Sequence, residues 1–238
     1  MSVRRLSLLL GACALLGAAA PGQAAAGELP ARADLHVVGS ATITWERVGV
    51  RVSPDLHARM LVTFAQFQPD YRKRVVLVLR ALPGRDGNPL WYRVSIPGRP
   101  NGRSGWVPAS SLEIAPADRW LVIMRGARRF ELVLRGRVVR SGPIAVGAPG
   151  MPTPLGLYYV QRGFRPVGYP ILGAYAFATS AYSALSEWPG GGIVGVHGTD
   201  TPQLIGQAVS HGCIRLLNSD IEYLRTVVHV GTPIKIVA

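Results

Sequence analysis

The sequence is poor in cysteine and in acidic residues. Its 238 residues include two cysteines, and 13 Asp and Glu stand against 26 Lys and Arg, which gives a formal net charge of +13. The basic residues are nearly all arginine, a composition that favours attraction to a polyanion. Helix-turn-helix, zinc-finger and RNP patterns are absent from the sequence, which argues against nucleic acid as that partner. Internal repeats are absent as well, so we expect ordinary compact domains.

The sequence also lacks an apolar run long enough to span a bilayer comfortably, which needs about 20 residues. Two arginines precede an apolar run over 6–20, and a small-residue cleavage site follows. This pattern predicts a secretory signal peptide over residues 1–26, with no transmembrane anchor after cleavage. A lipoprotein-processing box around Cys13 is the alternative, but processing there would leave an apolar stretch at the new N-terminus.

Removal of the leader changes both the charge and the thiol inventory. The leader holds two arginines and no acidic residue, so the formal net charge falls from +13 to +11. The mature chain would be secreted into the cell envelope, where we expect anionic cell-wall polymers or lipid headgroups as candidate partners. Cys213 would be its only thiol. An unpaired cysteine in an oxidising compartment is either an inert core residue or a functional group.

The N-terminal half, residues 37–115, shows short β-type runs broken by turns. The predicted strands cover 41–45, 48–52, 75–79, 91–96 and 105–107. Five short strands favour a small barrel. The order of signals, from Gly49-Val-Arg-Val to the closing Gly105-Trp-Val, resembles a bacterial SH3-like domain. Residues 55–74 show no regular pattern.

A linker is predicted at 115–118, and the second domain, residues 118–238, is again mainly β. The predicted strands cover 120–124, 130–134, 138–140, 144–147, 155–160, 193–196 and 232–237. The periodicity of 219–228 predicts one helix, capped by Asn218 or Ser219. Between 162 and 192 no period holds for long, and an irregular stretch of that length is typical of a lid.

Two short blocks near the C-terminus carry the chemistry: Gly-Val-His197-Gly198-Thr-Asp and Val-Ser210-His211-Gly212-Cys213-Ile-Arg-Leu. Imidazole is the side chain whose pKa suits the deprotonation of a thiol near neutral pH. Gly212 permits a tight turn before the thiol. The backbone N–H groups of Gly212 and Cys213 would then stabilise an oxyanion, so the blocks predict acyl transfer through a thioester.

The residues alone leave two questions open. Either His197 or His211 is a candidate base, because both lie near Cys213 in the sequence. A zinc site built from these three residues is the alternative chemistry, since zinc prefers histidine nitrogen and cysteine sulfur. Their spacing fits no standard metal signature, and no further acidic or histidine ligand stands out. We therefore expect neither a metal nor a cofactor.

The two blocks closely resemble the signature of the L,D-transpeptidase (YkuD-like) family, and Pro152-Thr153-Pro154-Leu155-Gly156 resembles an earlier strand of that family. The resemblance covers roughly 118–238 and implies a β-sandwich catalytic domain with one or two short helices. It implies that Cys213 is the nucleophile and that His197 is its base.

The resemblance also implies roles for the neighbouring residues. Gly198 would orient His197 through its carbonyl, while Ser210 and His211 would shape the oxyanion loop. Arg215 would bind a substrate carboxylate, for which a guanidinium is well matched. Tyr182 and Trp188 are candidates for lining the donor channel under the lid.

The activity implied is the formation of 3→3 cross-links between peptidoglycan stem peptides, one as donor and one as acceptor. L,D-carboxypeptidase activity and attachment of a protein to peptidoglycan are the alternatives within the family. A papain-like peptidoglycan hydrolase is disfavoured because His197 precedes Cys213 in the chain. A non-catalytic wall-binding protein is disfavoured because both residues are present.

Overall fold

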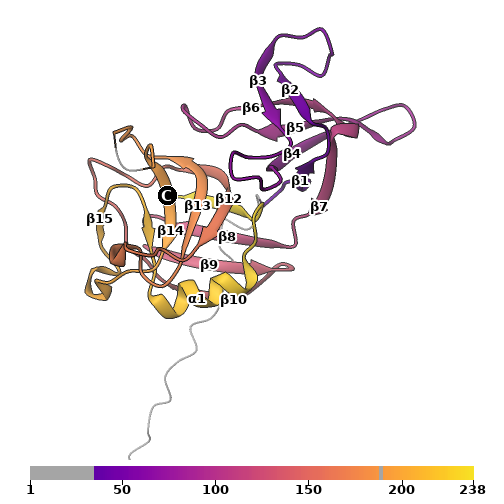
Figure 1. Cartoon of the computed structure of the whole chain (residues 1–238). Coiled ribbons are helices and arrows are strands. Elements are labelled where there is room, and N and C mark those ends of the chain that lie inside the picture. Colours follow the sequence, from indigo (N-terminus) through magenta and orange to yellow (C-terminus); the bar gives the residue numbers. More distant parts are fainter. Residues whose placement is uncertain (1–34, 188–189) are drawn as a thin grey trace, which may run out of the picture.

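The computed structural model describes residues 35–187 and 190–238, which form two β domains side by side (Figure 1). The predicted signal peptide, Cys13 and Trp188 lie outside these residues. Strands make up most of the regular structure, which confirms the mainly β class. No helix in the described ranges is long and apolar enough to cross a membrane.

The N-terminal domain is one curled sheet of seven strands in the order β3-β2-β6-β5-β4-β1-β7. The strands are β1 Gly39–Ile43, β2 Arg47–Arg51, β3 Met60–Ala65, β4 Val75–Pro83, β5 Pro89–Ser95, β6 Ser104–Pro108 and β7 Leu112–Pro116. Buried and more exposed residues alternate along β1, β2 and β6, as expected of strands with one face on a core. That core includes Val50, Val78 and Val94.

Two strands of this domain were not predicted. The sequence indicated five strands, whereas β3 occupies the unpatterned segment 55–74 and β7 runs into the predicted linker. The pattern failed there because most residues of these strands are only partly buried, so neither strand shows a clear apolar face. The resemblance to an SH3-like domain stays a prediction.

The second domain is built on one eight-stranded sheet in the order β10-β9-β8-β17-β12-β13-β14-β16. Its strands are β8 Arg119–Met124, β9 Arg129–Leu134, β10 Arg137–Pro143, β12 Gly156–Phe164, β13 Ala176–Tyr182, β14 Ile193–His197, β16 Ile214–Arg215 and β17 Pro233–Val237. A small parallel pair, β11 Val146–Gly147 and β15 Ala208–Ser210, lies beside it. The sheet curls so that both halves contribute to one core, which includes Leu121, Phe130, Val196 and Ile214.

The predicted lid over 162–192 is interrupted by strand structure, so its bounds were wrong. Strand β12 continues to Phe164, and β13 crosses the middle of the segment. Five of the seven residues of β13 are buried, and most are small, so the strand has no polar face to reveal its period. The irregular parts are 165–175, which includes the 3-10 helix Pro170–Leu172, and the connection from β13 to β14.

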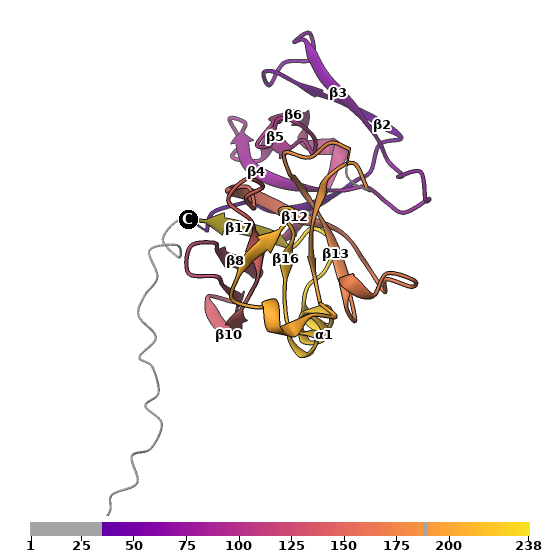
Figure 2. The same ribbon diagram turned by 90° about the vertical axis from the view of Figure 1, so that its left-hand side faces the viewer.

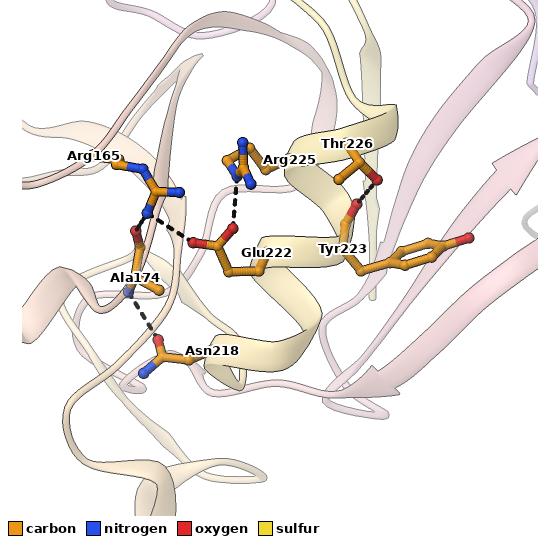
Figure 3. A network of polar contacts seen from close by, with 7 residues as sticks. All are labelled: Arg165, Ala174, Asn218, Glu222, Tyr223, Arg225 and Thr226. Carbon is orange, nitrogen blue, oxygen red and sulfur yellow. Dashed lines mark hydrogen bonds and ion pairs between the residues drawn. The ribbon is translucent and has the colours of Figure 1, made fainter.

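The predicted helix exists as α1, Asn218–Val227, and packs Ile221 and Leu224 into the core. The predicted cap was wrong: Leu217 is the N-cap, and within the described part of the chain no side chain hydrogen-bonds there. Figure 3 shows why Asn218 is unavailable, because its side chain reaches back to the Ala174 N–H (3.0 Å). Glu222 on the same helix pairs with Arg165 and Arg225 (Figure 3). These contacts tie the β12–β13 connection to α1.

The two domains meet closely. Strand β7 ends at Pro116 and β8 begins at Arg119, so two residues link the sheets. A cavity of about 170 Å³ lies at this junction, lined by Ser40, Ala115 to Arg119 and His229 to Pro233. In a second contact between the domains, the β5–β6 loop of the N-terminal domain extends toward the connection after β13 (Figures 1 and 2).

Candidate active site

Parallel pairing of β14 and β16 closes the gap between the two sequence blocks. Val196 lies opposite Ile214, and His197 lies opposite Arg215. Cys213 immediately precedes β16, so it lies beside the strand that ends at His197. The pairing therefore brings together two side chains that no single regular element could have joined.

Gly195 lies between the imidazole and the thiol. Its N–H donates to Cys213 Sγ at 3.3 Å. A Cβ atom on Gly195 would lie 3.3 Å from His197 Cδ2 and 3.7 Å from the same sulfur. Because both side chains come within 4 Å of one point, they flank Gly195 on the same side of the strand.

A short hydrogen bond fixes the tautomer of His197. Its Nδ1 lies 2.6 Å from the carbonyl oxygen of Gly198. A carbonyl can only accept, so the proton resides on Nδ1 and Nε2 carries the lone pair. The free nitrogen is bonded to Cδ2, and it therefore belongs to the ring edge that flanks Gly195 together with Cys213. A neutral imidazole held in this way is competent to accept a proton from a thiol.

Asn218 fixes the backbone that orients His197, a role that the sequence did not reveal. Its Oδ1 accepts from the N–H groups of Ala174 (3.0 Å) and Thr199 (3.1 Å), and its Nδ2 donates to the Thr199 carbonyl (2.9 Å). Both bonds to Thr199 hold the residue that follows Gly198. The signal was ambiguous because an Asn at a helix start is usually read as a cap.

The environment favours the uncharged forms of both side chains. Burial, helped by the positive charge of Arg215, lowers the pKa of His197 from 6.5 to about 4. Cys213 is half-buried as a residue, but protein surrounds its sulfur, and this burial raises the pKa of the thiol. The Gly195 N–H and Arg215 oppose that rise without reversing it. At neutral pH the pair is therefore a thiol beside a neutral imidazole.

The turn before the thiol is closed by Ser210. Its Oγ accepts from the Gly212 N–H (3.1 Å) and donates to the Cys213 carbonyl (2.6 Å). Gly212 has φ of 111°, a conformation that strains any residue with a side chain. The Gly212 N–H is therefore used within the turn, contrary to the expectation that it would face an oxyanion.

Thr153 is fully buried and hydrogen-bonds to this turn. Its Oγ1 donates to the Gly212 carbonyl (3.0 Å) and accepts from the Gly147 N–H (2.9 Å). The sequence placed Thr153 in a family-like strand without assigning it a contact. The structure places it directly against the turn that presents Cys213.

The other predicted site residues have different surroundings. Arg215 is half-buried, and among the described residues its Nε has no hydrogen-bond partner. His211 is half-buried and directly follows β15. The ring of Tyr182 faces the guanidinium of Arg99, 5.0 Å away, and so contacts the N-terminal domain. Trp188 lies outside the described residues.

Metal-binding groups do not gather here. Within 35–187 and 190–238, no three His, Cys, Asp or Glu side chains are placed to hold a metal ion. The three ligands of the zinc alternative, His197, His211 and Cys213, therefore do not form such a group.

Comparison with known proteins places residues 118–236 in a family. The model of the L,D-transpeptidase catalytic domain, YkuD, matches residues 118–236. The chain is 31% identical to YkuD of Bacillus subtilis (strain 168) over 175 residues, covering 73% of this chain and 93% of the relative. It is 26% identical to L,D-transpeptidase 1 of Mycobacterium tuberculosis H37Rv over 61% of this chain and 70% of the relative. A solved structure of an L,D-transpeptidase from Mycobacterium tuberculosis H37Rv has a TM-score of 0.47 at 18% identity, covering 85% of this chain and 100% of that one.

Proposed function

The chain belongs to the YkuD family of L,D-transpeptidase catalytic domains, and we propose that it transfers acyl groups between peptidoglycan stem peptides through a thioester on Cys213. The observation that carries the proposal is the hydrogen bond between His197 Nδ1 and the Gly198 carbonyl. It leaves Nε2 unprotonated on the ring edge beside the thiol, so His197 serves as the general base.

In the first half-reaction Cys213 Sγ attacks the L-centre carbonyl of the third residue of a donor tetrapeptide. The thiol proton passes to His197 Nε2, and the carbonyl oxygen becomes an oxyanion. The backbone N–H of Cys213 is the proposed donor to this oxyanion, because the Gly212 N–H is used by Ser210. As the oxyanion collapses, the C–N bond to D-alanine breaks, and the leaving amine takes the proton from His197.

In the second half-reaction an amine from another stem attacks the thioester. A C–N bond forms, the C–S bond breaks, and the amine's proton returns to the thiolate through His197. This gives a 3→3 cross-link. Water in place of the amine gives a carboxypeptidase, and a protein amine gives anchoring; these alternatives differ in the acceptor only.

Arg215 is the proposed anchor for a stem-peptide carboxylate. It lies opposite His197 in the β14–β16 pair and two residues after Cys213, so it is close to both reacting residues in the fold. Its Nε is buried without a hydrogen-bond partner among the described residues, which costs free energy. A carboxylate that accepted a hydrogen bond from a reoriented Arg215 would recover that free energy.

We further propose that the chain works outside the cytoplasm after cleavage of residues 1–26. The supporting observations are the leader pattern and the strong excess of arginine, which suits anionic cell-wall polymers. The domain over 37–115, proposed as SH3-like, would bind the wall or act as a spacer.

The test is mass spectrometry of the mature protein incubated with a disaccharide-tetrapeptide. We expect a dimer lighter than two substrates by one D-alanine, and a transient adduct on the peptide that contains Cys213. Tripeptide alone would identify a carboxypeptidase instead. Cys213→Ala is the control and should form neither product while keeping its melting temperature; turnover by this variant would refute the proposal.

A further inference from the structure

Asn101 of the N-terminal domain pairs with the catalytic sheet as a neighbouring strand would. Its Nδ2 donates to the Tyr182 carbonyl (2.7 Å), and its Oδ1 accepts from the Tyr182 N–H (3.0 Å). Both backbone groups of one residue are thus satisfied by a single side-chain amide, which mimics a peptide group of a β ladder. The two residues are 81 positions apart in the chain.

Arg99, from the same β5–β6 loop, holds the residues that follow. Its guanidinium donates to the carbonyl of Ser183 (3.0 Å from Nη2 and 3.3 Å from Nε) and to that of Leu185 (3.0 Å). It also lies over the ring of Tyr182, 5.0 Å from the centroid. One loop of the N-terminal domain therefore fixes the main chain of Tyr182–Leu185 at three carbonyls.

That segment packs on the turn that presents the nucleophile. Ser183 is 6% exposed, and its Cβ lies 3.0 Å from where a side chain on Gly212 would begin. Its N–H donates to the Gly192 carbonyl (2.8 Å), which closes the loop back toward β14. A displacement of Ser183 would therefore change the packing around Gly212, the residue before Cys213.

From this chain of contacts we propose that Arg99 and Asn101 are positioning residues of the active site. The N-terminal domain holds Tyr182–Leu185 against the Gly212–Cys213 turn and so keeps the thiol in its reactive geometry. The proposal deepens the function proposed above and rests on it for its catalytic consequence. Its structural consequences are that the Cys213 thiol is shielded from alkylating reagents and that the Tyr182–Leu185 segment is ordered. Both are measurable without any substrate.

The test uses the full mature chain and the variants Asn101→Ala and Arg99→Ala. The matched controls are Asn88→Ala and Arg93→Ala. Their exposed side chains, among the residues that the structure describes, hydrogen-bond within the N-terminal domain, at Asp86 and Ser104. Three quantities are measured: backbone amide exchange of 182–187, the rate of Cys213 alkylation by iodoacetamide, and kcat and KM with a tetrapeptide donor.

Loss of the two Asn101 bonds should raise amide exchange of Tyr182 and Ser183 by about thirtyfold, since each bond contributes about 1 kcal/mol. We expect faster alkylation, and a fall in kcat of about tenfold with a smaller change in KM, because the reacting atoms are misplaced. Should Arg99→Ala fail to fold, Asn101→Ala alone carries the test.

Two outcomes would overturn the proposal. One is that Asn101→Ala matches Asn88→Ala in exchange, alkylation and turnover. The other is that it lowers the melting temperature alone, which would make the contact a domain fastener. If the wild-type chain turned over no stem peptide, the proposed function would fail, while exchange and alkylation would still decide the positioning role.

Discussion

His197 Nδ1 lies 2.6 Å from the carbonyl oxygen of Gly198, the residue that follows it. A backbone carbonyl thus occupies the place that a carboxylate fills in many cysteine and serine enzymes. Burial lowers the pKa of His197, and a neutral carbonyl stabilises an imidazolium too little to offset that effect, so His197 stays neutral until a proton arrives.

Stability should fall with acid because of His197. Burial lowers its pKa from 6.5 to about 4, so the unfolded chain binds a proton in this range that the folded chain does not. The stability it contributes is present above about pH 6.5 and is lost as the pH falls toward 4, up to about 3 kcal/mol. The free energy of unfolding, measured with urea and plotted against pH, should have different slopes for wild type and His197→Gln only in that window. Parallel plots would contradict the pKa shift.

Cys213 should titrate above the ordinary thiol range. Burial raises its pKa, so the thiolate is scarce at neutral pH and forms as His197 removes the proton during attack. The rate of alkylation by iodoacetamide should therefore inflect above about pH 8.5. An inflection well below pH 7 would instead reveal a preformed thiolate–imidazolium pair.

Gly195→Ala should damage activity more than stability. The added methyl would lie 3.3 Å from His197 Cδ2 and 3.7 Å from Cys213 Sγ, so the imidazole must move. We expect a loss of kcat of about 100-fold. Gly150→Ala is the matched control, since nothing lies within 4 Å of its added atom. Equal activity in the two variants would show that the imidazole tolerates the methyl.

Asn218→Ala should loosen the orientation of His197. It removes three hydrogen bonds, two of them to Thr199, and should cost about 1–2 kcal/mol of stability. Loss of kcat beyond that of Ser219→Ala, a neighbouring change at the same helix end, would mark the orienting role. If both variants kept full kcat at equal melting temperatures, Asn218 would be dispensable.

Thr153→Val should disturb the turn before Cys213 while keeping the side-chain volume nearly constant. The hydroxyl is fully buried and bridges Gly147 to Gly212, so its loss leaves a buried N–H unsatisfied, at about 1–3 kcal/mol. Thr153→Ser keeps the hydroxyl and should retain most of the stability and turnover. Denaturant unfolding and kcat of both variants give the answer, and identical values for Val and Ser would rule out the bridge.

The sequence by itself determined the β class, most strands of both domains, the core face of α1 and the two blocks that contain His197 and Cys213. Such features are local, because alternation over five residues and the chemistry of neighbouring side chains depend only on residues that are close together in the sequence. Strand β13 escaped because it is buried on both faces and has no alternation to read.

Only the tertiary structure decided how the blocks meet and what supports them. Parallel pairing of β14 and β16 set His197 beside Cys213, and the hydrogen bonds of Ser210 closed the turn on the Gly212 N–H. Asn101 reaches Tyr182 across 81 positions to bind its backbone groups. Every residue has a backbone C=O group and every residue except proline has an N–H group, so a contact to them leaves no signature in the sequence, and folding alone selects the partner.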